Sequence, residues 1–135
     1  MKQLIDFSQM VTVFDKVREK IVENKAAVAA KRYEMETSGI TIDGLKVSTD
    51  RDSQSLVTGA AMSAMLDNTY VCKWKTAEGF VELDADKLLN MAKCLRKYVQ
   101  ACFDREAVLI EVVESETFSD EMLNEGWPDG IFDNA

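Results

Sequence analysis

The chain has 135 residues and a formal charge of −8, because 24 acidic side chains outnumber 16 basic ones. It contains no histidine, so the commonest general base and the catalytic arrangements built on it are missing. The length suits one domain, and no run approaches the roughly 20 apolar residues of a membrane span or resembles a secretion signal. We therefore expect a protein that is cytosolic, or assembled in the cytosol, and that does not bind membranes.

The N-terminal third predicts one long helix. Residues 1–7 form a short apolar lead-in, in which Leu4, Ile5 and Phe7 are available to pack on a neighbour, and Ser8 is a candidate cap. From Met10 to about Glu36 there is no glycine or proline, and apolar residues recur at steps of three and four. This spacing is typical of an amphipathic helix.

A first β-hairpin is predicted after this helix. Short apolar runs flank Asp43-Gly44, a dipeptide that tolerates the positive φ angles of a tight turn. Gly39 suits the left-handed residue that ends a helix. Thr49, Asp50 or Ser53 can cap the next helix, which should span residues 52–67. Gly59 lowers the stability of that helix, which would be explained by another element packing on its backbone.

The same order then repeats. Tyr70–Trp74 and Phe80–Leu83 read as a second hairpin, turning around Glu78-Gly79, and Asp84 offers a cap for a final helix that ends near Val113. Whether the two hairpins pair into one sheet stays open. The sequence therefore predicts an α+β fold with three helices, two of them long, interrupted by two β-hairpins.

The final helix carries a coiled-coil-like seam, interrupted by Arg105. Two interpretations remain open for the long helices: they pack antiparallel within one subunit, or they also associate with other copies. Residues 1–113 would form the domain. Residues 114–135 differ from this domain in charge, since they contain seven acidic side chains and no Lys or Arg. Of the net charge of −8, only −1 therefore belongs to residues 1–113.

The acidic segment also contains apolar anchors, which a purely solubilising tail would not need. We expect it to fold onto its own body or onto a partner. The candidate partner-binding residues are these anchors and one aromatic residue of the second hairpin: Trp74, Phe118, Leu123, Trp127, Ile131 and Phe132.

Candidate chemistry is sparse. Asp50 and Asp52 could hold a divalent cation, but capping of a helix start explains this polar cluster better. Three cysteines lack zinc-like spacing, so we expect no metal and no cofactor. Lys73-Trp74-Lys75 could stack on a nucleic-acid strand, but two lysines beside acidic neighbours favour core packing. No catalytic residues and no nucleic-acid site are predicted. The structural turn and cap residues are Gly39, Asp43, Gly44, Asp50, Gly79 and Asp84.

Several motifs in one order resemble a domain of unknown function that is widespread in tailed bacteriophages and prophages, in proteins described as tail or tail-fibre components. They include Ile42-Asp43-Gly44, the segment from Thr49 to Gln54, the segment from Trp74 to Leu83, and the segment from Val99 to Glu106. The similarity covers about residues 25–110.

This resemblance implies a non-enzymatic structural or assembly protein located in the virion tail and assembled in the host cytoplasm. Its expected partners are a tail or tail-fibre protein and further copies of itself, with a trimer favoured to match a fibre. The alternative is an intracellular phage factor, either a tail-fibre assembly chaperone or an inhibitor of a host defence protein that uses the acidic segment to occupy a basic surface.

Overall fold

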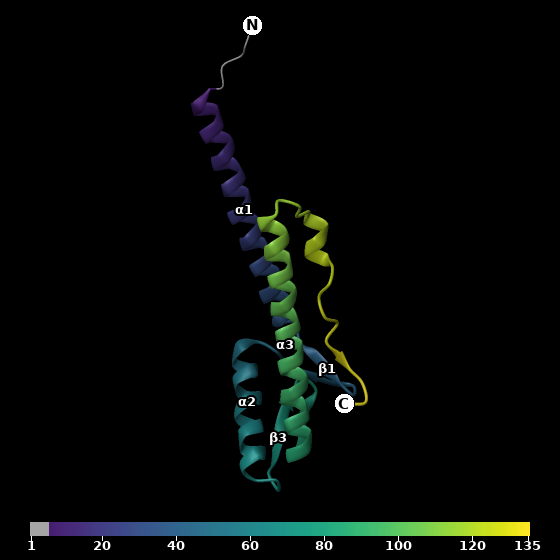
Figure 1. Ribbon diagram of the computed structural model, residues 1–135. Helices are drawn as coiled ribbons and strands as arrows, with labels where there is room; N and C mark the ends of the chain where they lie inside the picture. Colours follow the sequence, from purple (N-terminus) through teal and green to yellow (C-terminus); the bar gives the residue numbers. More distant parts are fainter. Residues whose placement is uncertain (1–5) are drawn as a thin grey trace.

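The computed structural model describes residues 6–135 and has an α+β fold built on two long helices. α1 (Phe7–Glu36) and α3 (Ala85–Glu114) run antiparallel, since Lys25 meets Glu114 and Arg32 meets Glu106 (Figure 1). α2 (Arg51–Leu66) lies beside the N-terminal half of α3. The antiparallel interpretation of the long helices therefore holds for the part of α1 that lies against α3.

The start of α1 differs from the prediction. Asp6, and not Ser8, is the cap: its carboxylate accepts a hydrogen bond of 2.9 Å from the backbone N–H of Ser8. The helix consequently begins at Phe7, whose side chain is 80% exposed instead of packing on a neighbour. Leu4 and Ile5 lie outside the described residues.

The first hairpin belongs to a three-stranded sheet with the order β2-β1-β5. β1 (Ile40–Ile42) and β2 (Leu45–Val47) are antiparallel, and their turn has the positive φ angles expected at Asp43 (47°) and Gly44 (84°). β5 (Ile131–Phe132) pairs with β1 in parallel. The sequence did not predict this third strand, because its pairing joins residues about ninety positions apart.

The second hairpin forms a separate two-stranded sheet. β3 (Val71–Thr76) pairs with β4 (Gly79–Asp84), and Cys72 and Trp74 are half-buried while Val71 and Lys73 are exposed. The open question of a joint sheet is thus answered: the two hairpins do not pair with each other among residues 6–135. Both instead lean on α3, in keeping with the low stability of an isolated hairpin.

The core has two parts. The larger one fills the space between α2, the N-terminal half of α3 and the two sheets, and it includes Val57, Leu88 and Met91. The smaller one lies where α1 crosses the C-terminal half of α3, around Val28, Leu109 and Val113, which are at most 1% exposed. The expectation that another element packs on the backbone of Gly59 is wrong, since a Cβ at this position of α2 would meet no atom within 4 Å.

After α3 the chain turns back and runs along that helix (Figure 1). It forms the 3-10 helix η1 (Asp120–Asn124) before reaching β5. Arg105 holds this return: its Nε donates to the carbonyl oxygen of Glu125 at 2.8 Å, and it lies directly against Gly126. The arginine that interrupts the apolar seam of α3 therefore anchors residues 115–135 onto the body of the domain.

Candidate functional site

A buried carboxylate organises the junction of α1, α2 and α3. Glu36 is 1% exposed and accepts hydrogen bonds from Arg32 (2.6 Å), Arg51 (3.0 Å) and Gln54 (3.0 Å). Nε of Arg51 also forms an ion pair with the Glu36 carboxylate at 2.6 Å. Arg32 also meets Glu106 of α3 at 3.4 Å and lies over the ring of Phe103. Glu36 thus joins α1 to α2, and Arg32 extends the network to α3 through Glu106.

The protonation of Glu36 follows from these contacts. Burial by itself would raise the pKa of its carboxyl group, but the hydrogen bonds from Gln54, Arg51 and Arg32 outweigh burial and hold the pKa below its usual value. Glu36 is therefore an anion at neutral pH with every acceptor position engaged by the protein. This arrangement stabilises the fold, and it offers no free group to a substrate.

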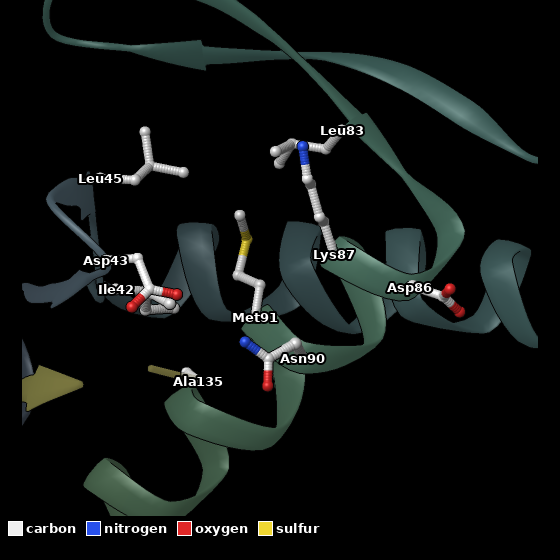
Figure 2. A pocket seen from close by; sticks show the side chains of 9 residues that line it. All are labelled: Ile42, Asp43, Leu45, Leu83, Asp86, Lys87, Asn90, Met91 and Ala135. Atoms are coloured by element: carbon white, nitrogen blue, oxygen red, sulfur yellow. The ribbon is translucent and has the colours of Figure 1, made fainter. Parts of the chain in front are cut away.

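A shallow groove of about 450 Å³ lies between the first hairpin and the first two turns of α3. Its floor is apolar: Met91 rises from α3 toward the space between Leu45 and Leu83 (Figure 2). The rim is polar and consists of Asp43, Asp86, Lys87 and Asn90, with Ala135 beside them. An apolar floor with scattered rim charges suits one apolar side chain of a partner protein.

The third feature is the N-terminal half of α1, which extends past the end of α3 (Figure 1). Every residue from Asp6 to Lys20 is exposed, including Phe7 (80%) and Phe14 (60%). From Ile21 onward the same helix face is covered, first by the smaller core. An apolar face this extensive on a single helix is of the kind that marks a contact surface in other proteins. We call residues 7–20 of this face the exposed seam; its apolar members are Phe7, Met10, Phe14 and Val17.

The predicted partner-binding residues lie mostly within the chain's own packing. Three of them join the smaller core, where the indole N–H of Trp127 donates to the carbonyl oxygen of Leu123 at 2.7 Å and Phe118 packs nearby. Trp74 and Phe132 pack against the larger core. Ile131 is the exception, with 58% exposure. The structure therefore does not gather these six residues into one surface.

The predicted caps and turn residues occupy the expected kinds of position. Asp50 accepts from the backbone N–H of Ser53 at the start of α2, and Asp84 accepts from that of Lys87 at the start of α3, each at 2.9 Å. Gly39 and Gly79 have positive φ angles of 94° and 121°. These residues shape the chain and do not meet at a common site.

Within residues 6–135 no three His, Cys, Asp or Glu side chains come together in a way that could hold a metal ion. In that same part of the chain, no helix has the length and apolar character needed to cross a membrane. Cys94 and Cys102 are buried, and burial raises the pKa of both thiols, as it does for half-buried Cys72.

Sequence reasoning missed two features. The Glu36 network was not predicted, because its members are up to 74 residues apart in the sequence and only Arg51 lies in the polar cluster at the start of α2. The exposed seam was foreseen as a helix but not as a free surface. The sequence did contain a signal for this surface. Apolar residues recur at steps of three and four as far back as Phe7, in a part of α1 that α3 does not reach.

No curated protein and no solved structure matches this chain. A family described as a domain of unknown function, DUF4376, matches residues 19–124, which is most of the chain and includes all three helices and both hairpins in whole or in part. The chain belongs to the DUF4376 family.

Proposed function

We propose that this protein is a tail-associated structural protein of a bacteriophage, a tail-fibre or adaptor component that acts through protein–protein contacts and not through catalysis. The observation that carries the protein-contact part is the exposed seam, on which Phe7 is 80% exposed and Phe14 is 60% exposed. Keeping such an apolar face in water is costly, at about 25 cal/mol per Å², so a partner that covers it gains affinity.

The assignment to a phage tail is supported by the ordered motifs between about residues 25 and 110, which resemble a domain found in tail and tail-fibre proteins. The fold is compatible with such a role. The α3 helix and the returning segment brace the lower half of α1, so the free half projects from a fixed base as an attachment element.

Mass spectrometry of purified phage particles tests this proposal. We expect peptides of this protein in a fixed ratio to those of a tail protein. Particles that lack tails but keep their capsids should not contain them. Particles that carry no stoichiometric amount of the protein would rule out a structural role in the virion.

A second candidate function is an intracellular phage factor, a fibre-assembly chaperone or an inhibitor of a host defence protein. It is favoured by the surface of residues 114–135, on which all seven acidic side chains are exposed. A basic partner surface would be attracted to this charge. Affinity purification from infected cells separates the two candidates: a host protein as the main partner, lost at high salt, supports the second.

A further inference from the structure

The exposed seam follows a heptad repeat that continues from the covered half of α1, with the polar residue Asn24 at one d position. With Phe7 at position a, the a positions are Phe7, Phe14, Ile21 and Val28, and the d positions are Met10, Val17 and Asn24. Val28 is fully buried against α3, and Ile21 packs at the edge of the same cluster. The repeat therefore runs from an occupied interface into an unoccupied one along the same helix face.

The half of α1 that packs on α3 indicates what kind of element the exposed half can bind. α3 lies on the a/d face of α1 in the antiparallel direction and ends at Glu114, whose carboxylate meets Lys25 of α1 at 2.8 Å. Beyond this point, a groove of about 210 Å³ opens between α1 and the end of α3. It is lined by Val17, Lys20, Ile21, Asn24, Val113, Glu116 and Phe118. A second antiparallel helix fits here as a continuation of the path of α3.

We propose that the occupant is α1 of a second copy of this chain, which lies antiparallel on residues 7–24 and forms a two-fold symmetric dimer. In the register that pairs Phe14 with Val17 of the second copy, Met10 meets its Ile21, and Phe7 meets its Asn24 beside the groove. Each seam thus covers the other. The overlap is about 27 Å long at 1.5 Å per residue.

Charge distinguishes this direction from the parallel one. The residues flanking the seam at positions e and g are Val11, Arg18 and Lys25, and Val13 and Lys20. In a parallel pair, Lys20 would face Lys25 of the other helix, and like charges at such positions are unfavourable. In the antiparallel register, Lys20 faces Val13 and Arg18 faces Val11. The aliphatic stems of the basic residues then cover the flanking valines, while their charges stay in water.

The symmetry of the contact also argues for a dimer. A two-fold contact uses the same surface on both copies and closes, so a single face of α1 is sufficient. The trimer expected from the sequence would need three α1 helices to share the seam in parallel. The inference deepens the protein-contact part of the proposed function, because both rest on the exposed seam. Mass spectrometry of particles tests the tail assignment, and the oligomeric state tests the dimer, so the two can fail separately.

Light scattering on the purified full-length protein over a concentration range tests the proposal. We expect a mass of about twice the 15.2 kDa of one chain, decreasing toward one chain on dilution. The substitution Phe14→Asp should give a monomer at every concentration. Phe14 is 60% exposed and belongs to neither core cluster, so this change leaves both cores intact, and unchanged circular dichroism verifies the fold.

The chain offers a matched control in Val22→Asp. Val22 lies on the same helix with 64% exposure, but at position b, away from the seam. This variant should dimerise as well as the unaltered protein. A monomeric unaltered protein, a trimer, or a dimer that is equally weakened by both substitutions would overturn the proposal.

Disulfide trapping tests the direction. In a background with Cys72→Ser, Met10→Cys mixed with Ile21→Cys should form a disulfide between the two variants, because these positions face each other only in the antiparallel register. Met10→Cys alone should remain reduced. A rapid disulfide in Met10→Cys alone would show that like positions meet, and would replace the antiparallel dimer with a parallel assembly.

Discussion

Replacing Glu36 by glutamine removes the negative charge at the centre of the junction while keeping its shape. In Glu36→Gln, the guanidinium groups of Arg32 and Arg51 lose the anion that they contact at 2.6 Å. Removing one partner of a buried ion pair costs about 3–5 kcal/mol when the remaining charge stays buried. Here the cost is smaller, since the side chain of Arg51 is 55% exposed to water and Arg32 retains Glu106.

We therefore expect Glu36→Gln to lower the free energy of unfolding by about 2–3 kcal/mol. An unfolding entropy of about 2.1 cal/mol/K per residue converts this loss, for a chain of this length, into a decrease of roughly 7–11 °C in Tm. Thermal unfolding followed by circular dichroism measures the change. Glu34→Gln is the matched control, because Glu34 is on the same helix, with a side chain 69% exposed and paired only with Lys31. Its effect should be under about 0.5 kcal/mol.

The pH dependence gives a second test with a definite sign. Because the folded-state pKa of Glu36 is lowered from its ordinary value of 4.5, its contribution is fully present above that value. The contribution is lost as the pH falls from 4.5 through the lowered folded pKa. The difference in stability between the unaltered protein and Glu36→Gln should shrink over this range. A difference that is absent at pH 7, or that does not change with pH, would refute the role assigned to the carboxylate.

Three further predictions concern single positions. Gly126→Ala should destabilise the chain by about 1–3 kcal/mol, because Gly126 has a φ of +78° and the new Cβ would lie 2.5 Å from Nε of Arg105. Urea unfolding would measure the loss, and proteolysis of residues 115–135 should become faster. Gly59→Ala should raise stability by up to about 1 kcal/mol, since this helical position has open space, and an unchanged or lower midpoint would contradict that. A thiol reagent at neutral pH should modify Cys72 before Cys94 and Cys102, because only Cys72 is partly exposed. Equal rates for all three thiols would contradict the burial of Cys94 and Cys102.

Local patterns in the sequence determined the elements of this protein. The periodicity of apolar residues predicted three helices, and Asp43-Gly44 and Glu78-Gly79 marked the two hairpin turns, because these signals depend on neighbours a few positions apart. The α+β class follows from them. So does the start of α3, where Asp84 caps the helix.

Tertiary structure decided what the elements do with one another. Three contacts join residues that no local pattern brings together: Ile131 pairs with Thr41, Arg105 anchors the return segment, and Glu36 meets Arg51. The same is true of α1: its heptad repeat extends from Phe7 to Val28, and the end of α3 at Glu114 divides it into a covered and a free half. Burial depends on where other segments lie in space, so the surface available to a partner becomes visible only once the chain is folded.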